Sequence, residues 1–126
     1  MRLLAIIAVV LVAALHFGFL TLEMFFWDHT FGQKVFAMTA EQSANSAALA
    51  ANQGLYNGFL AAGLLWGLIA KKRDVQIYFL LCVIVAGLFG GATAKPSIWF
   101  IQTLPGAIAL ALVLLAARKM LKQNIL

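Results

Sequence analysis

Four long apolar runs, separated by short polar segments, dominate the chain. They extend from Leu3 to Trp27, from Ser46 to Ala70, from Val75 to Thr93 and from Ser97 to Ala117. A helix needs roughly 20 residues to cross a hydrocarbon core of about 30 Å, and each run reaches or approaches that length. The pattern predicts four transmembrane helices in one transmembrane domain of residues 1–126, with residues 28–45 as a long outer loop.

The composition fits lipid better than water. Hydrophobic residues make up 64% of the chain and charged residues 10%, whereas soluble domains carry roughly 25% charged residues. The net charge of +5 does not indicate a nucleic-acid partner, because the Lys and Arg residues cluster at the ends of the apolar runs, as in membrane proteins. Arg2 and the Ala13–Ala14 pair would suit a signal peptide, but the apolar run continues to Trp27 and favours a retained helix. We expect membrane lipid as a partner.

The positive charges predict the orientation, since Lys and Arg are retained on the cytoplasmic side during insertion. The outer segments contain only Lys34 and Lys95. Short links at residues 71–74 and 94–96 require antiparallel neighbouring helices. We therefore expect an all-α fold, an integral membrane antiparallel four-helix bundle, with both termini cytoplasmic. In that orientation the cytoplasmic segments hold seven of the nine positive residues, namely Arg2, Lys71, Lys72, Arg73, Arg118, Lys119 and Lys122.

Local signals refine the helices. Thr39 with Gln42 three residues later fits a capping box, so the second helix is predicted to begin near Ala40. Pro105 predicts a kink in the last helix. Small residues spaced by four allow helices to pack closely, and we expect these seams to lie within the protomer, with a homodimer through the same seams as the alternative. The seams contain Ala50, Gly54, Gly58 and Ala62, then Gly63 and Gly67, then Gly87 and Gly91.

Polar residues inside the runs follow a pattern. On the first helix His16, Leu20, Glu23 and Trp27 are spaced 0, +4, +7 and +11, which places them on one stripe, with Phe19 beside it. His16 and Glu23 lie about 10 Å apart along the axis, too far for direct contact. Asn52, Gln53, Tyr56 and Asn57 share one arc of the second helix, and Gln102 lies at similar depth on the fourth. Together these residues predict an outward-facing polar pocket.

Each residue type has a role in this hypothesis. Glu23 and His16 are the candidate acid and base. The candidate ligand-binding residues are Asn52, Gln53, Tyr56, Asn57, Gln102, Trp27, Phe19 and Leu20. The amides and Tyr56 would equally serve as mutual hydrogen-bond partners that fix helix register, and Trp27 suits an interfacial belt. We expect no metal and no cofactor, because Cys82 is a single cysteine and Asp28 with His29 supplies too few ligands.

Several segments together resemble a known family. They are Ala14 to His16, Leu22 to Trp27, Gly32 to Phe36 and Ala51 to Gly63, and the Asn-Gln-Gly-Leu-Tyr-Asn sequence at 52–57 is the most specific. The chain is similar over its whole length to the domain-of-unknown-function 1304 family of small four-helix bacterial membrane proteins. The resemblance implies that fold and a bacterial inner membrane location, but it implies no activity.

Three functions remain open at this point. The leading hypothesis is a pocket that binds, and in an enzyme would transform, a small, partly apolar or lipid-like molecule from the outer side. An alternative is a proton-coupled exporter resembling the small multidrug-resistance proteins, although the charge bias disfavours dual topology and Glu23 lies off-centre. A third is an accessory membrane subunit without a ligand.

Overall fold

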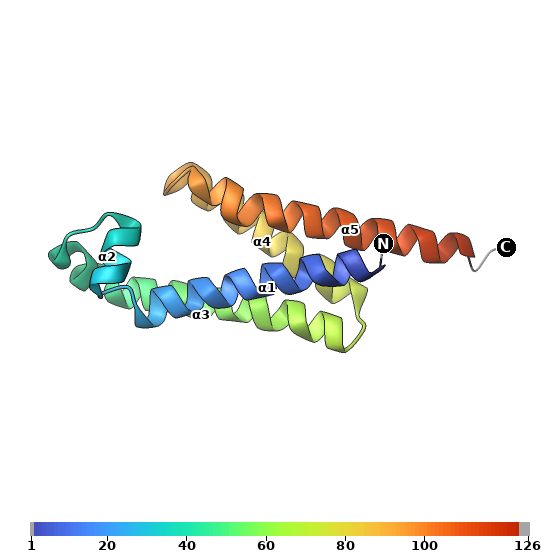
Figure 1. The fold of residues 1–126 in the computed structure, drawn as a ribbon, viewed down its shortest axis with the longest axis horizontal. Coiled ribbons are helices and arrows are strands. Elements are labelled where there is room, and N and C mark those ends of the chain that lie inside the picture. The colour runs from blue at the N-terminus through green and yellow to red at the C-terminus, as the bar shows by residue number, and fades with distance from the viewer. Residues whose placement is uncertain (1, 124–126) are drawn as a thin grey trace. The chain divides into compact units, whose positions relative to one another are not determined.

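The computed structural model describes the backbone of residues 2–123 and the side chains of residues 2–118. The elements are α1 (Arg2–Phe25), α2 (Thr30–Phe36), α3 (Ala40–Ile69), α4 (Arg73–Thr93), the π-helix η1 (Trp99–Thr103) and α5 (Leu104–Gln123) (Figure 1). Over residues 2–123 every regular element is a helix. The all-α prediction is therefore confirmed.

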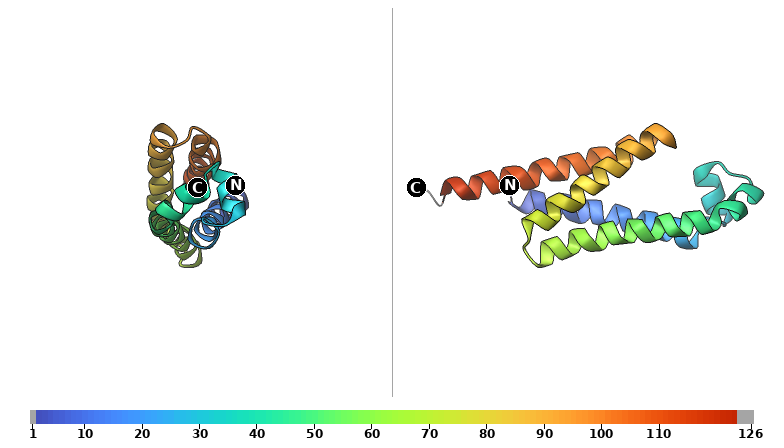
Figure 2. Two further views of the ribbon diagram at one scale, coloured as in Figure 1. Left: turned by 90° about the vertical axis from the view of Figure 1, so that its left-hand side faces the viewer. Right: turned by 180° about the vertical axis from the view of Figure 1, so that it is seen from behind.

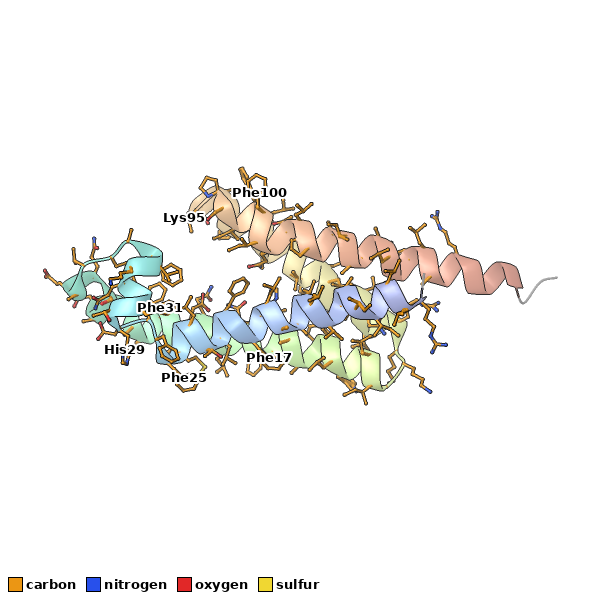
Figure 3. All side chains as sticks on the ribbon, in the orientation of Figure 1. Phe17, Phe25, His29, Phe31, Lys95 and Phe100 are labelled. Atoms are coloured by element: carbon orange, nitrogen blue, oxygen red, sulfur yellow. The ribbon has the colours of Figure 1, made fainter. Side chains whose placement is uncertain are left out.

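Three helical segments in the described part of the chain are long and apolar enough to cross a membrane. They are Arg2–Phe25, Arg73–Thr93 and Trp99–Arg118. α3 is longer, at 30 residues, but its amide side chains make it less apolar. Large aromatic side chains such as Phe25 and Phe100 are exposed (Figure 3), by 62% and 68%, which suits contact with lipid better than contact with water. Membrane character is thus supported for three helices, and a four-helix membrane bundle stays a prediction.

The helices form two compact units. The central unit is Ala14–Ala61, and the terminal unit is Met1–Ala13 together with Ala62–Leu126. In the central unit the second half of α1 and the first part of α3 lie side by side and run in opposite directions, and α2 belongs to the connection between them (Figure 1). α1 and α3 each contribute to both units.

In the terminal unit, α4 packs against η1 and α5 (Figure 2). Small residues make this contact close, since a side chain on Gly87 would meet Thr103 and one on Gly106 would meet Val83. Gly91 lies directly beneath the indole of Trp99. The glycines at 87 and 91 therefore form a seam within the protomer, as predicted.

The last membrane-length segment is irregular immediately before Pro105. The residues from Trp99 to Thr103 form a π-helix, and the backbone N–H of Leu104 donates to the carbonyl of Trp99, five residues back. Proline has no N–H to donate and its ring crowds the preceding turn, so a widened turn at this point relieves both problems. The sequence predicted the position of this irregularity, and the structure shows that it is a π-helix.

The start of α3 follows the predicted capping box. The backbone N–H of Thr39 donates to Oε1 of Gln42 at 2.9 Å, and the backbone N–H of Gln42 donates to Oγ1 of Thr39 at 3.1 Å. Two of the orphan donors at the helix start are thereby satisfied, and α3 begins at Ala40. The prediction for this helix start is confirmed.

A cationic hollow lies at the end of the terminal unit where α1 begins and α3 ends. Its volume is about 310 Å³. Polar side chains from three segments line it, together with apolar residues of α3 and α5; the main contributors are Arg2, Lys71, Arg73, Gln76, Leu68 and Val113. Arg2 and Lys71 thus lie at one hollow, although α1, α2 and α3 separate them along the chain.

Candidate functional site

The centre of the candidate site is a hydrogen bond between α1 and α3 in the central unit. Nδ2 of Asn57 donates to Oε2 of Glu23 at 2.7 Å, and the bond is partly buried. This is the distance of a strong amide–carboxyl hydrogen bond. Of the four residues on the predicted arc of α3, Asn57 is the one bonded to Glu23.

Glycines on α3 allow the two helices to approach at this point. A Cβ on Gly54 would lie 3.1 Å from Cβ of Glu23 and 2.7 Å from Cγ of Met24, and one on Gly58 would overlap the Leu20 side chain. The absence of side chains at these two positions brings the α1 backbone near enough for Asn57 to reach the carboxyl group. The predicted seam at 54 and 58 is therefore occupied by the chain's own α1.

The predicted stripe on α1 faces α3. Leu20 packs over Gly58, and Glu23 meets Asn57. Nε1 of Trp27 donates to Oγ of Ser46 at 3.0 Å, and its ring lies 4.5 Å from that of Phe36. Leu20 and Glu23 of α1 thus contact α3 at successive turns, whereas Trp27, in the turn after α1, contacts Ser46 of α3 and Phe36 of α2.

His16 and Phe19 lie on α1 on the N-terminal side of Leu20 and Glu23. His16 is buried, with 1% of its surface exposed. The imidazole meets the Phe19 ring edge-on, with 5.4 Å between ring centroids and 70° between planes. An apolar ring against a buried imidazole makes this part of the site predominantly apolar.

The remaining predicted residues lie elsewhere. Asn52 and Gln53 are exposed, and Tyr56 is half exposed with its ring 6.0 Å from that of Phe59. Gln102 belongs to the terminal unit, where its Nε2 donates to the carbonyl oxygen of Val83 at 3.1 Å. The structure therefore brings together Glu23, Asn57, Leu20 and Trp27 along the α1–α3 contact, and it leaves three polar residues of α3 exposed.

Sequence reasoning missed a second polar cluster at the α2 end of the central unit. Ser43 is fully buried. Its hydroxyl donates to Oδ1 of Asp28 at 2.6 Å and accepts a hydrogen bond from Nε2 of Gln33 at 3.0 Å. Gly32 lies so close to the carbonyl of Phe26 that no side chain would fit. The sequence predicts only a long outer loop at residues 28–45, so it does not indicate this buried cluster.

The side chains of the described residues offer no site for a metal ion. No group of three His, Cys, Asp or Glu residues is close enough to coordinate one within that part of the chain. His29 instead stacks obliquely near Phe26, with ring centroids 5.8 Å apart. The candidate site contains a carboxyl group, an amide and, further along α1, an imidazole against an aromatic ring.

Comparison with known proteins identifies the family. The sequence model of the family described as "Protein of unknown function (DUF1304)" matches residues 10–114. The chain belongs to the DUF1304 family. A curated relative, "Uncharacterized protein YpaA" of Lactococcus lactis subsp. lactis strain IL1403, is 33% identical over 117 residues, which cover 90% of this chain and 97% of the relative. No solved structure matches the chain.

The DUF1304 match contains the whole α1–α3 contact. Both partners of the central hydrogen bond, Glu23 and Asn57, lie within residues 10–114, as do α2 and η1. Arg2 of the cationic hollow lies before the matched region. The family assignment therefore covers the candidate site but carries no activity to it.

The Glu23–Asn57 pair keeps hydrogen-bonding capacity beyond its own bond. A carboxylate accepts at both oxygens, and the carbonyl oxygen of an asparagine accepts while its amide nitrogen donates. The Asn57 amide nitrogen donates one of its two N–H groups to Glu23, so the pair retains one N–H donor beside the Asn57 carbonyl oxygen and the Glu23 carboxyl group. A hydroxyl group, which both donates and accepts hydrogen bonds, would complement such a pair.

Proposed function

We propose that the chain is a multi-pass protein of the bacterial inner membrane that binds a small, partly apolar or lipid-like molecule. In this proposal four helices cross the membrane, both termini are cytoplasmic, and a polar site opens toward the outer face. Glu23 and Asn57 bind the polar end of the ligand. Leu20, Phe19 and Tyr56 contact its apolar body.

The cationic hollow supports four crossings. Arg2 begins α1 and Lys71 follows the end of α3, and both line this one hollow. If α1 crosses the membrane, the chain must cross again before Lys71 to return to the same side. α3, with 30 residues, extends about 45 Å and exceeds a hydrocarbon core of about 30 Å. Val113 of α5 lines the same hollow, which supports a return of the chain to that side after α4.

The observation that carries the binding proposal is the 2.7 Å hydrogen bond between Asn57 and Glu23. Polar groups within membrane helices are costly and normally serve a network or a function. Here the Glu23 carboxyl group, near the proposed outer end of α1, accepts a hydrogen bond from the Asn57 amide of α3, which runs antiparallel to α1. Asn52 and Gln53 are exposed close by along α3, and exposed amides at this depth need polar partners, which a ligand headgroup supplies.

The test uses a photoreactive dodecanol with a diazirine in its chain, added to the protein in lipid nanodiscs. Peptide mapping should locate labelling at the α1–α3 pair, around Leu20 and Tyr56. Unlabelled dodecanol should compete at least about tenfold better than dodecanoate, because dodecanoate brings a second carboxylate to Glu23 and lacks the hydroxyl donor. Glu23→Leu should weaken competition by about tenfold.

Thr21→Val is the matched control, because the Thr21 hydroxyl donates to the carbonyl of Phe17 on its own helix. Labelling spread evenly over all exposed apolar residues, and unchanged in Glu23→Leu, contradicts the proposal. Retained binding in Glu23→Gln with loss of pH-dependent transport favours the proton-coupled exporter. An apolar triple variant at Glu23, Asn52 and Asn57 that keeps every cellular phenotype favours the accessory subunit.

A further inference from the structure

The cationic hollow gathers positive charge from distant parts of the sequence. Arg2 is the first residue of α1, Lys71 belongs to the link after α3, and Arg73 is the first residue of α4. No Asp or Glu is among the described residues that line it. Three like charges around one hollow repel each other unless an anion joins them.

The link between α3 and α4 separates its positive side chains. Lys71 has left-handed backbone geometry, with φ of 55°, and the N–H of Lys72 donates to the carbonyl of Gly67 at 2.9 Å. Lys71 lines the hollow, whereas Nζ of Lys72 lies over the Trp66 ring, 5.7 Å from its centroid. Adjacent residues of equal charge therefore have different surroundings, and only one of them belongs to the hollow.

The rest of the lining is apolar. Leu68 of α3, Ile6 of α1, and Val113 and Ala116 of α5 lie among the hollow's walls. The start of α4 adds the side chains of Arg73 and Gln76. A hollow with a cationic rim and an apolar interior matches a molecule with an anionic head and a hydrocarbon tail.

We propose that the cationic hollow binds the phosphate group of an acidic phospholipid. Arginine side chains bind phosphate oxygens in pairs, and basic pockets between membrane helices on the cytoplasmic side suit such headgroups. The volume of about 310 Å³ is at the lower end of the range for ligand sites, so it accommodates a headgroup and the first part of the acyl chains. The inference rests on the proposed membrane insertion and not on the Glu23 site.

Native mass spectrometry of the full chain in neutral detergent tests this proposal, with phosphatidylglycerol and phosphatidylcholine of the same acyl chains as probes. One phosphatidylglycerol should bind at least about tenfold more tightly than phosphatidylcholine, since each nearby cation contributes about fivefold in affinity. Glycerol phosphate has a phosphate but no acyl chains, and it should bind at least about tenfold more weakly than the lipid. Equal binding of glycerol phosphate overturns the lipid assignment in favour of a soluble phosphate ligand.

Two double variants with the same loss of charge separate a site from general attraction. Arg2→Gln with Arg73→Gln should weaken phosphatidylglycerol binding about 25-fold. Lys72→Gln with Arg118→Gln should change it by less than about twofold, because Lys72 lies over Trp66 and Arg118 is exposed outside the hollow lining. Equal weakening in both variants overturns the proposal.

Ala116→Trp provides a second test that leaves every charge in place. Ala116 lines the hollow, so an indole there should fill it and reduce phosphatidylglycerol binding at least about tenfold. Unchanged binding overturns the proposal. Circular dichroism and monodisperse elution check that each variant is folded. The dodecanol assay with the same variants should be unaffected, and phosphatidylglycerol binding should survive Glu23→Leu, so failure of one proposal is distinguishable from failure of the other.

Discussion

Truncation of Asn57 to alanine removes the amide group that donates to Glu23 across the α1–α3 contact at 2.7 Å. Side-chain hydrogen bonds between membrane helices couple by about 0.6 kcal/mol on average and by about 1.7 kcal/mol at most. A bond to a carboxyl group is stronger than one between neutral groups when the carboxyl is ionised. Because this bond is short and partly buried, we expect a coupling of about 1 to 1.7 kcal/mol.

A double-mutant cycle measures this coupling. The four proteins are the parent, Glu23→Ala, Asn57→Ala and the double variant, each unfolded in mixed micelles of dodecyl maltoside and sodium dodecyl sulfate. The free energy of unfolding follows from the loss of helical circular dichroism. The double variant should be less destabilised than the sum of the single variants, because the second truncation removes a group that has already lost its partner.

The control cycle combines Asn57→Ala with Thr21→Ala. Thr21 is two residues from Glu23, but its hydroxyl donates within α1, so the two effects should add within about 0.3 to 0.5 kcal/mol. A coupling between Glu23 and Asn57 no larger than this control would refute the reasoning, since it would show that the two side chains do not stabilise each other across the helices.

Three further predictions address packing, the α2 cluster and orientation. Gly58→Val should destabilise the fold by about 1 to 3 kcal/mol through overlap with Leu20. Adding Leu20→Ala should restore part of the lost free energy of unfolding in the same assay. An unchanged stability in Gly58→Val contradicts the close contact. Ser43→Ala should cost about 1 to 3 kcal/mol, because its buried hydroxyl joins two polar side chains, and an unchanged unfolding midpoint contradicts that role. In a cysteine-free background, Lys34→Cys should react with a membrane-impermeant maleimide on spheroplasts and Lys72→Cys only after lysis; the opposite pattern reverses the proposed orientation.

The sequence predicts best those features that depend on residues close together along the chain. The start of α3 at Ala40 follows from Thr39 and Gln42, which bond to each other's backbone. The irregularity before Pro105 follows from the missing N–H of proline. α1 ends at Phe25, whereas the apolar run in the sequence continues to Trp27. Hydropathy does not detect this end, because it does not show that the Trp27 indole bonds to Ser46.

The candidate site is predicted in part. Helical periodicity alone places Leu20 and Glu23 on one face of α1, and this face contacts α3 as the pattern predicts. It does not specify which residue of α3 meets Glu23, because the register of two packed helices depends on side-chain volumes along both. The register observed places Gly54 and Gly58 against α1. Asn57 then reaches the carboxyl group, while Asn52 is exposed.

The α2 cluster was beyond sequence reasoning for a different reason. Ser43 is buried by a segment that returns over the start of α3 after an irregular turn at residues 26–29. Its contacts to Asp28 and Gln33 require the close approach of Gly32 to the Phe26 carbonyl. A polar residue in the first turn of a helix is ordinarily solvated, and only the tertiary contact changes that expectation.

The amide side chains of α3 account both for its modest hydropathy and for its part in the candidate site. Asn52, Gln53 and Asn57 lower the hydropathy of α3, and length and composition single out three other helical segments as membrane spans among the described residues. Asn57 is also the partner of Glu23. An amide that is unfavourable for an isolated helix in lipid becomes favourable when α1 and α3 insert as a pair, because each then satisfies a polar group of the other. In the proposed topology, hydropathy, which scores each helix alone, therefore underestimates α3 at the position where it carries the proposed site.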